Sequence, residues 1–398
     1  MTHNFTTISW SFLVAVGTAV GWLWMVINAV RAKHCQKFLE DYPLLRGDLN
    51  VEHLPVVDVV VAARNEAESL PAAISSLLRQ TYPRLRVVVV DDRSVDSTPA
   101  ILREMSASSG GKLTVIRIDE CPPGWLGKCH ALYVGAQSCN GDYVLFTDAD
   151  VIWAPTAIER SVACILEENP DHLCVFPSLE TRTIGERIFA LGFAQLFFAY
   201  WRPYRAEEPR SNSYVGVGAF NMVRRRFYEK LGGHRPLRLT VVDDVALGKL
   251  LKFSGARTWV LSARSEVRVR WQKGLIGSIR GVEKNAFAGL GYSFVRTAGA
   301  IAGASMLWLA PWCVALCASS PTIFFIALAG LICQLAYGWG VAKSLGVSPF
   351  YGILAPVSVS LCLFALARSA VLTLLHRGVW WRDTFYPLEE LKKYDKLK

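Results

Sequence analysis

An apolar run near the start of the chain, residues 8–30, contains no charged side chain. A helix needs about 20 such residues to cross the hydrocarbon layer of a membrane, so this run predicts a transmembrane helix. A cleaved signal peptide would have a basic leader, whereas no Lys or Arg precedes this run, and Trp22 and Trp24 lie within it. We therefore expect residues 1–50 to form a transmembrane helix and a linker.

Three more apolar stretches lie towards the other end, at residues 297–319, 321–342 and 350–375. They predict two to three C-terminal membrane helices within residues 297–376. Overall, 52% of the residues are hydrophobic and only 19% are charged, which argues against a disordered chain and against an ordinary soluble enzyme. The ten cysteines form no C-x-x-C pair, so neither a zinc site nor a disulfide framework is expected.

Basic residues beside these runs predict the topology. Arg31, Lys33 and Lys37 follow the first run, so the positive-inside tendency puts the rest of the chain in the cytoplasm. Three full C-terminal crossings would leave the basic tail, residues 377–398, outside. Because Arg368 would be costly in hydrocarbon, we expect the last stretch to be re-entrant or interfacial, with a cytoplasmic tail. The expected location is a membrane of the bacterial inner-membrane type, with the domain between the apolar segments in the cytoplasm.

The central part of the chain alternates strands and helices. Residues 56–63, 86–90, 113–118 and 142–146 are rich in β-branched side chains, as strands of a parallel sheet are. Helical stretches separate these segments. This order predicts the α/β class, with a mostly parallel sheet flanked by helices, and such sheets bind ligands beyond the carboxyl ends of their strands.

Polar residues follow several of these strands. Arg64 and Glu66 come after the first strand, and Asp91 and Asp92 end the second, so all four are expected at the ligand-binding edge. Glu66 could equally cap the next helix. Lys128 lies in a glycine-rich loop near a helix start, a place suited to a phosphate group, although a solvated surface lysine fits the same pattern.

Asp148 and Asp150 follow the fourth strand. Two carboxylates at this spacing can converge on a hard divalent cation that holds a diphosphate, or on the hydroxyls of a ribose. Taken alone, the pair also fits a solvated turn.

In order and approximate spacing, these clusters resemble the family 2 glycosyltransferases, which have the GT-A fold. The resemblance covers roughly residues 56–292 and rests on VVVAARNEAESL, VVVVDDRSVDST, GWLGKCHAL, FTDADV and the acidic pair in VVDDVALGKLLKFSG. With the apolar segments and the GWLGK loop, the chain looks most like ceramide glucosyltransferases and hopene-associated glycosyltransferases. The resemblance implies a cytoplasmic GT-A catalytic domain over residues 51–271 and an interfacial helix over residues 272–296.

The resemblance also implies roles for the clustered residues. Asp92, with Asp91 beside it, would bind the nucleoside, and Arg64 and Glu66 would line the same pocket. Lys128 would bind phosphate.

In the family's metal motif the second aspartate holds the cation, which here is Asp150 with Mg²⁺ or Mn²⁺, while Asp148 joins the nucleotide-sugar site. The cation would neutralise charge on the leaving diphosphate. Gly218 would let the backbone approach the sugar, although a glycine here also fits a β-bulge. His234 could hydrogen-bond the acceptor or be merely polar surface.

Asp244 matches the catalytic base of the family's acidic pair, with Asp243 beside it. Removing the proton of an acceptor hydroxyl is general-base work, for which one carboxylate suffices. The pair could also cap the helix expected at residues 245–251, and the two roles are compatible. The resemblance implies one in-line displacement with inversion.

One departure concerns the (Q/R)-x-x-R-W motif of many relatives. The nearest match here is Arg268 followed by Arg270 and Trp271, one residue short. Arg280 with Lys284 is the alternative, so the basic group that faces the diphosphate stays open.

Two segments suggest membrane contact. Residues 202–238 combine basic and aromatic side chains, a composition that fits docking on anionic lipid headgroups. No recognition motif points to nucleic acid, which is not an expected partner. Residues 188–201 are too short to span a membrane and could be an interfacial helix or a core helix.

The expected function is inverting transfer of a hexose from a nucleoside-diphosphate sugar, with UDP as the expected nucleotide, to the hydroxyl of a membrane lipid acceptor. The alternatives are a polyprenyl-phosphate glycosyltransferase, a processive polysaccharide synthase, and a catalytically inactive lipid-binding or scaffold protein. All the acidic clusters are present, which argues against the inactive protein.

Overall fold

The computed structural model describes residues 9–45, 47 and 50–395. Its contacts divide the chain into two compact units. The α/β unit comprises Gln36–Glu180, Trp201–Trp271 and Thr373–Lys398, and the helical unit comprises Met1–Cys35, Thr181–Tyr200 and Gln272–Leu372. Ile8, where the first apolar run starts, and the basic residues Lys396 and Lys398 lie outside the described residues.

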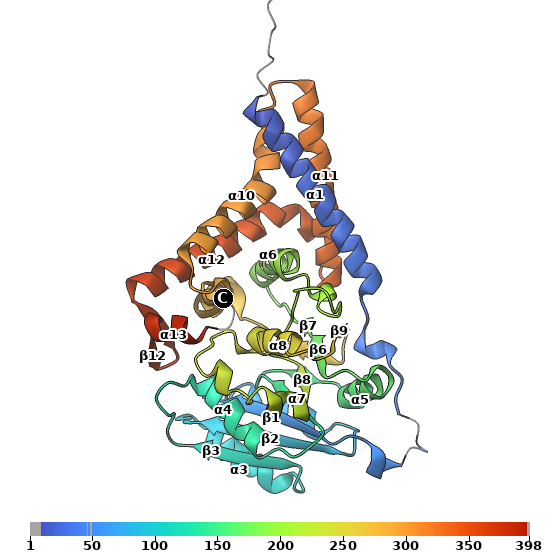
Figure 1. Ribbon diagram of the computed structural model, residues 1–398, viewed down its shortest axis with the longest axis vertical. Coiled ribbons are helices and arrows are strands. Elements are labelled where there is room, and N and C mark those ends of the chain that lie inside the picture. Colours follow the sequence, from blue (N-terminus) through green and yellow to red (C-terminus); the bar gives the residue numbers. More distant parts are fainter. Residues whose placement is uncertain (1–8, 46, 48–49, 396–398) are drawn as a thin grey trace, which may run out of the picture. The chain divides into compact units, whose positions relative to one another are not determined.

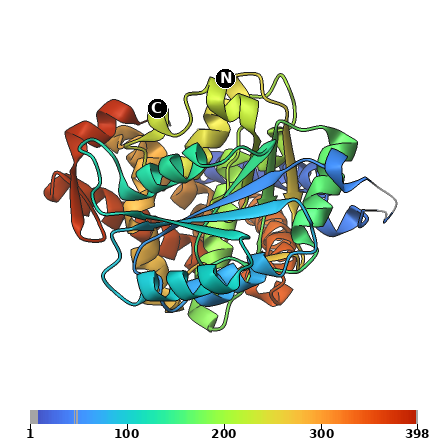
Figure 2. The same cartoon turned by 90° about the horizontal axis from the view of Figure 1, so that it is seen from below.

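The α/β unit is built on a seven-stranded sheet in the order β3-β2-β1-β4-β8-β6-β9. The first four strands of this order are parallel, whereas β8 runs antiparallel to both of its neighbours. Figure 2 shows the blue strands β1 and β2 side by side. The strands are β1 Val57–Ala63, β2 Leu85–Asp92, β3 Leu113–Ile118, β4 Tyr143–Thr147, β6 His172–Phe176, β8 Asn221–Arg224 and β9 Thr258–Ser262. The predicted α/β class, with a mostly parallel sheet, is confirmed.

Helices cover both faces of the sheet, as Figure 1 labels them. On one face Ile74 of α2 packs with Val59 and Val61 of β1, and on the other face Leu132 of α4 packs with Val60. A strand that is covered on both faces needs apolar side chains at consecutive positions, which explains the valine run of β1. The helices are α2 Leu70–Leu78, α3 Thr98–Ser108, α4 Gly127–Gln137, α5 Ala157–Glu168, α7 Arg225–Lys230 and α8 Asp243–Phe253.

The register of the parallel strands sets the position of the polar clusters. Ala63 pairs with Asp91, and Val61 pairs with Thr147. Strands β1, β2 and β4 therefore end at the same edge, which brings the residues that follow each of them together. This is the arrangement that the order of strands predicts.

Short elements complete the α/β unit. They are the small sheet of β5 Ile152–Trp153, β10 Val267–Val269 and β7 Ser178–Leu179, and the short helices η1 Leu39–Asp41, η2 Val51–His53, η3 Pro203–Arg205 and η4 Arg235–Leu237. Residues 214–220, which include Gly218, form an irregular segment before β8.

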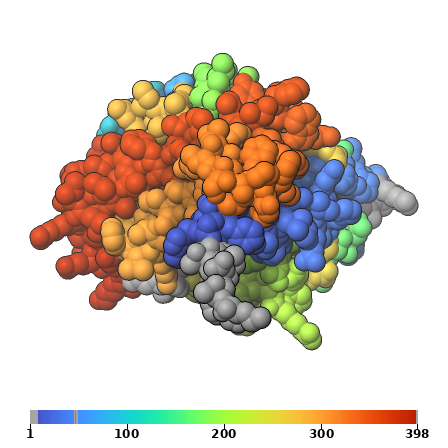
Figure 3. Space-filling view, turned by 90° about the horizontal axis from the view of Figure 1, so that it is seen from above, coloured from blue at the N-terminus to red at the C-terminus, as the bar shows by residue number. Residues whose placement is uncertain are grey.

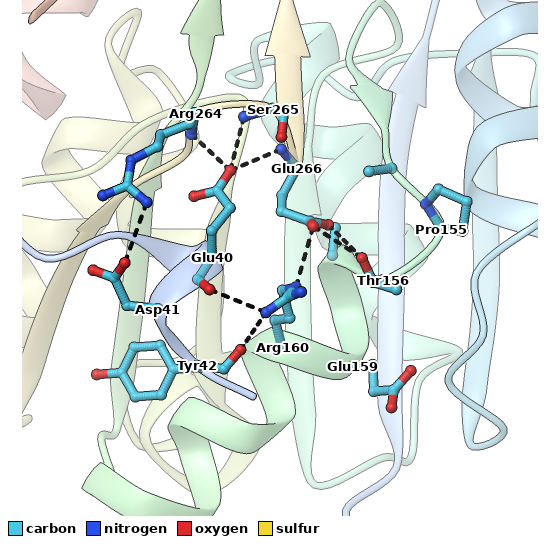
Figure 4. A network of polar contacts seen from close by, with 12 residues as sticks. Glu40, Asp41, Tyr42, Pro155, Thr156, Glu159, Arg160, Arg264, Ser265 and Glu266 are labelled. Carbon is cyan, nitrogen blue, oxygen red and sulfur yellow. Dashed lines mark hydrogen bonds and ion pairs between the residues drawn. The ribbon is translucent and has the colours of Figure 1, made fainter. Parts of the chain in front are cut away.

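The linker after the first helix is fixed to the α/β unit by Glu40, as Figure 4 shows. Its Oε1 accepts hydrogen bonds from the backbone N–H groups of Arg264, Ser265 and Glu266, at 2.7, 2.7 and 3.1 Å. Arg160 joins the network by donating from Nε to Glu266 Oε1 at 3.1 Å. A carboxylate in such a nest of N–H groups holds the chain in one place.

The C-terminal residues fold as part of the α/β unit. Strands β11 Gly378–Trp381 and β12 Thr384–Pro387 form an antiparallel hairpin, and α13 Leu388–Tyr394 follows beside it (Figure 1). The Oγ1 of Thr240 donates to the carbonyl of Tyr394 at 3.3 Å, and Arg238 lies 4.2 Å above the Tyr394 ring. The sequence pattern indicates only a basic tail here, so this ordered segment was not expected.

In the helical unit, α1 Trp10–Cys35, α10 Phe294–Leu316 and α11 Pro321–Ser344 pack on one another. Trp22 donates from Nε1 to the carbonyl of Leu307 at 2.7 Å and makes an edge-to-face contact with Trp308. Gly330 lets α11 approach the backbone of Ala19, as small residues do between membrane helices. Figure 3 shows the dark blue α1 beside the orange helices of this bundle.

A second group in the helical unit contains α6 Ile184–Trp201, α9 Gly274–Ala286 and α12 Ala355–Leu375, with η5 Ala288–Leu290 and η6 Pro349–Leu354. Cys362 of α12 contacts the carbonyl of Phe189 on α6 at 3.6 Å. Arg368 of α12 donates from Nε to Glu283 of α9 at 2.9 Å. Helix α12 thus packs on α6 and carries an ion pair with α9.

Within the described residues, four helical segments are long and apolar enough to cross a membrane. They are Trp10–Cys35, Phe294–Leu316, Pro321–Ser344 and Pro349–Leu375. They coincide with the four apolar stretches of the sequence, and such helices are typical of a membrane protein.

Candidate active site

A small pocket lies at the edge where β4 ends, and acidic residues surround one lysine in it. Lys128 Nζ lies 2.8 Å from Asp148 Oδ1 and 3.5 Å from Asp243 Oδ1. The lining residues are Lys128, Leu132, Phe146, Thr147, Asp148, Gly218, Asn221, His234, Asp243, Asp244 and Leu247. Lys128, Asp148, Gly218 and the acidic pair, all selected from the sequence, therefore meet here, although they come from four separate parts of the chain.

Local structure explains why these side chains meet. Asp148 is the first residue after β4, Lys128 lies in the first turn of α4, and the acidic pair forms the first turn of α8. Val242 is the N-cap residue of α8, so Asp243 and Asp244 are its first two helical residues and not the caps that the sequence allowed. Carboxylates in a first turn interact favourably with the helix dipole, in addition to any chemical role.

Gly218 lies beside two carboxylates of the pocket. A Cβ atom at this position would lie 2.5 Å from Asp148 Oδ2 and 3.4 Å from Asp244 Oδ2. The Gly218 carbonyl also accepts a hydrogen bond from the Asp148 N–H at 3.1 Å. The absence of a side chain thus keeps the space between Asp148 and Asp244 open.

The charges of this pocket are strongly coupled. Burial and the neighbouring Asp243 raise the pKa of Asp244 to about 6, against the opposing effect of Lys128. Burial disfavours the charge of Lys128, but the surrounding Asp148, Asp243 and Asp244 outweigh it, and the pKa of Lys128 is raised well above its ordinary value. A carboxylate with a pKa near 6 beside a permanent ammonium is suited to accept a proton near neutral pH.

Asp150 lies next to this pocket and does not line it. Burial raises its pKa to about 7, and the nearby charges of Asp148 and Glu66 add to the effect. Such crowding of carboxylates is unfavourable without a cation between them. Among residues 9–45, 47 and 50–395, no group of three or more His, Cys, Asp or Glu side chains is already arranged as a metal site.

A second cluster surrounds Asp92. Arg93 donates to both carboxylate oxygens of Asp92, at 2.7 and 3.1 Å, and Arg64 Nη1 lies 3.9 Å from Asp92 Oδ2. Gly127 packs directly against this carboxylate, where a Cβ atom would collide with it. The N-cap residue of α2 is Ser69, not Glu66, and the Ser69 hydroxyl donates to Glu66 Oε2 at 2.8 Å.

Asp91 is not brought into this cluster. Its Oδ2 accepts from Arg117 of β3 at 2.7 Å, and its Oδ1 accepts from the Ser94 N–H at 3.2 Å. Successive strand residues point to opposite faces, so Asp91 and Asp92 project in different directions. A nucleotide-binding role for Asp91 stays a prediction.

The pocket and the Asp92 cluster are continuous at two points. Gly127, which packs on Asp92, is followed directly by Lys128 of the pocket. The negative charges of Asp148, in the pocket, and of Glu66, in the Asp92 cluster, both raise the pKa of Asp150. One edge of the sheet therefore carries a continuous row of charged groups.

Several residues at this edge have no individual role in the prediction from sequence, although Asn221 directly follows a segment, residues 214–220, that resembles the family's sugar and acceptor pocket. Asn221 lines the pocket, donates to the Asp244 carbonyl at 3.2 Å and contacts His172 at 2.6 Å. Arg93 could have been selected, because it directly follows Asp92 in the sequence. Arg382 and Tyr386 of the hairpin carry no such signal.

The remaining candidates have simpler surroundings. His234 is 1% exposed, and its Nδ1 lies 2.7 Å from the Tyr228 hydroxyl. Burial lowers the pKa of His234 to about 3, so this side chain is neutral where it lines the pocket. Arg268 pairs with Glu180 at 3.2 Å on the small sheet. In the basic segment, Arg224 pairs with Asp171 at 3.0 Å.

Comparison with known proteins shows similarity over part of the chain. Residues 58–232 match the family model described as Glycosyl transferase family 2. A similar solved structure is that of the mannosyltransferase PcManGT from Pyrobaculum calidifontis in complex with GDP-Man and Mn²⁺. The superposition covers 92% of this chain and 99% of the PcManGT chain, with a TM-score of 0.53 and 20% sequence identity. This likeness concerns the fold.

Curated relatives match over shorter regions. The 4,4'-diaponeurosporenoate glycosyltransferase of Staphylococcus haemolyticus is 39% identical over 24% of this chain and 24% of its own length. The beta-monoglucosyldiacylglycerol synthase of Synechocystis sp. is 29% identical over 52% of this chain and 42% of its own. The undecaprenyl-phosphate 4-deoxy-4-formamido-L-arabinose transferase of Aeromonas hydrophila is 30% identical over 30% of this chain and 36% of its own length. The chain thus spans less than half the length of each, and its similarity to the glycosyl transferase family 2 model covers residues 58–232.

Proposed function

We propose that this protein is an inverting glycosyltransferase that moves a hexose from a nucleoside-diphosphate sugar, with UDP as the expected nucleotide, to the hydroxyl of a membrane lipid. The observation that carries the proposal is the convergence of Asp148 and Asp244 on the side-chain-free space at Gly218, beside Lys128. The Asp244 carboxylate, which can accept a proton, and the Lys128 ammonium, which can bind phosphate, thus line the same pocket. This is the pair of groups that sugar transfer from a diphosphate requires.

In the proposed reaction Asp244 accepts the proton of the acceptor hydroxyl as the oxygen attacks the anomeric carbon. The bond from that carbon to the diphosphate oxygen breaks in the same step, which inverts the configuration. Lys128 lies where it can bind the leaving diphosphate, and Asp148 and Asp243 keep it charged. Asp92, Arg64 and Glu66 would line the nucleotide end of the same edge.

The residues present fit a divalent cation, which we propose to be Mg²⁺ or Mn²⁺. Asp150 is a hard oxygen ligand whose charge is disfavoured by burial and by Asp148 and Glu66, so a bound cation would relieve that repulsion. A bound cation would act as a Lewis acid on the departing diphosphate. The similar fold of PcManGT was solved with Mn²⁺, which is consistent with this proposal.

The proposed acceptor is a lipid because the chain carries membrane-type helices and its relatives include a glucosyldiacylglycerol synthase. A ceramide-like or hopanoid acceptor is the finer form of this proposal. The basic segment 202–238 would dock on anionic headgroups. A polyprenyl phosphate is the second candidate acceptor, which the similarity to the Aeromonas transferase favours.

We propose a topology with the α/β unit in the cytoplasm. This unit contains residues both before α10 and after α12, so the chain must cross the membrane an even number of times between them. If α10 and α11 cross, α12 does not. The ion pair of Arg368 with Glu283 supports an interfacial position for α12, because a charged pair is costly in hydrocarbon.

A transfer assay tests the proposed function. The full chain in detergent would be given radiolabelled UDP-glucose, UDP-galactose or GDP-mannose with a total lipid extract and Mn²⁺. We expect labelled lipid with the wild type and with Glu229→Gln, an exposed carboxylate control on α7, but not with Asp244→Asn. Label in an acid-labile phosphate ester would favour the polyprenyl acceptor, and nucleotide binding without any transfer would favour the inactive scaffold.

A further inference from the structure

The turn of the C-terminal hairpin has an unusual residue. Trp381 pairs with Thr384, which leaves Arg382 and Asp383 as a two-residue turn. Arg382 has φ of 51°, in the left-handed region, where turns of this kind favour glycine, asparagine or aspartate. An arginine held in that conformation at the edge of a charged site points to a use for its side chain.

The two turn residues exchange charges with the nucleotide cluster. The Arg382 guanidinium donates to Glu66 Oε1 and to the Arg64 carbonyl, and Asp383 Oδ2 pairs with Arg64 Nη2 at 3.3 Å. The Arg382 guanidinium therefore lies against the backbone of Arg64, and a carboxylate pairs with each of the two arginines. Arg64 also lies 3.9 Å from Asp92 Oδ2, so the hairpin meets the cluster assigned to the nucleotide.

A third contact fixes the other side of the hairpin. Tyr386 accepts through its hydroxyl oxygen from the Gly127 N–H at 3.4 Å, at the start of α4. Tyr386 is 8% exposed and Leu391 of α13 is fully buried, so the hairpin and the helix after it are anchored. The Arg382 side chain, by contrast, remains 37% exposed and is accessible to a ligand.

We propose that Arg382, supplied by the hairpin that follows the last apolar helix, binds the diphosphate of the nucleotide donor together with Arg64. This inference rests on the proposed function and adds a donor-binding residue to it. Guanidinium groups bind phosphate oxygens through two parallel hydrogen bonds, and a pair of them matches the charge of a diphosphate. Glu66 and Asp383 hold the two arginines in position until the phosphates replace those contacts. The proposal also identifies a basic group for the diphosphate, which the shortened R-W motif left open.

The test measures the affinity of the full chain in detergent for UDP and for uridine, by calorimetry in the presence of Mn²⁺. Arg382→Gly is the main variant, because glycine adopts the left-handed conformation without strain and should preserve the turn. We expect it to bind UDP about tenfold more weakly and uridine as well as the wild type does. Arg382→Lys should recover part of the loss.

Arg377→Ala is the matched control. Arg377 precedes the same hairpin, is exposed, and makes no side-chain hydrogen bond or ion pair with any described residue. We expect its UDP affinity to equal that of the wild type. In the transfer assay, Arg382→Gly should raise the donor KM and leave the acceptor KM unchanged.

Four results would overturn the inference. UDP affinity that is unchanged in Arg382→Gly means that the arginine does not bind the donor, and tighter binding means that it blocks the site. Equal losses for UDP and uridine, with a lower melting temperature, mean that it only supports the fold. If the wild type binds no nucleoside diphosphate, including GDP, the proposed function itself fails and the role of Arg382 fails with it.

Discussion

The ammonium of Lys128 lies 2.8 Å from Oδ1 of Asp148, and this ion pair joins the first turn of α4 to the end of β4. The same ammonium is 3.5 Å from Asp243 and lowers the pKa of Asp244, so it is the charge around which the acidic residues are arranged. A change at Lys128 should therefore alter both phosphate binding and proton transfer.

Replacing Lys128 by methionine should raise the pKa of Asp244 above its value of about 6, because the neighbouring positive charge is lost. The acidic limb of the pH–rate profile should move to higher pH, and the donor KM should rise. Steady-state kinetics between pH 5 and 9 would measure both. An unchanged acidic limb would show that Lys128 and Asp244 are not coupled.

In the wild type, kcat/KM should rise with pH through about 6, since Asp244 accepts a proton only in its ionised form. The activity should be low below this pH and reach a plateau above it. Asp244→Asn should lose activity by roughly 100- to 10,000-fold, the range ascribed to general-base catalysis. An asparagine variant that keeps the same pH profile would exclude Asp244 as the base.

Gly218→Ala should abolish transfer with little loss of stability. The new Cβ would lie 2.5 Å from Asp148 Oδ2, so this carboxylate must move away from Lys128. Gly289→Ala is a matched control, because a Cβ there meets nothing within 4 Å. Activity and melting temperature would be measured for both, and normal activity in Gly218→Ala would argue against a reaction in this space.

The proposed topology predicts which native cysteines an impermeant maleimide can reach. Cys317 is exposed at the end of α10 and should react from outside in spheroplasts, when it is the only cysteine kept. Cys35, exposed at the end of α1, should react only after lysis. A reporter fused after residue 398 should also lie inside, and a reporter found outside would mean that α12 crosses the membrane.

Glu40→Ala should destabilise the α/β unit. Three backbone N–H groups would lose their acceptor. Water can replace it at the exposed Arg264 and Ser265, whereas an unsatisfied N–H at the buried Glu266 costs about 1–3 kcal/mol. The melting temperature should fall, while activity per folded molecule should stay near that of the wild type. Glu52→Ala, in the short helix η2, serves as the control. Equal melting temperatures of the two variants would contradict the role given to Glu40.

Much of this protein follows from its sequence alone. Apolar length predicts the four long helices, because hydrocarbon admits only long uncharged segments. Runs of β-branched residues predict the parallel strands, and the carboxyl ends of parallel strands lie at one edge, so the sequence suffices to place Asp92 and Asp148 at this edge. These features depend on local periodicity and composition, which the sequence carries directly.

Tertiary structure decided which charges pair. Asp91 and Asp92 are neighbours in sequence, yet one bonds to Arg117 of the adjacent strand and the other to Arg93. The hairpin that brings Arg382 to Glu66 joins residues more than 300 positions apart, and no local pattern specifies such a contact. Ion pairs and hydrogen bonds depend on positions within a few ångströms, and only the packing of the whole unit determines those positions.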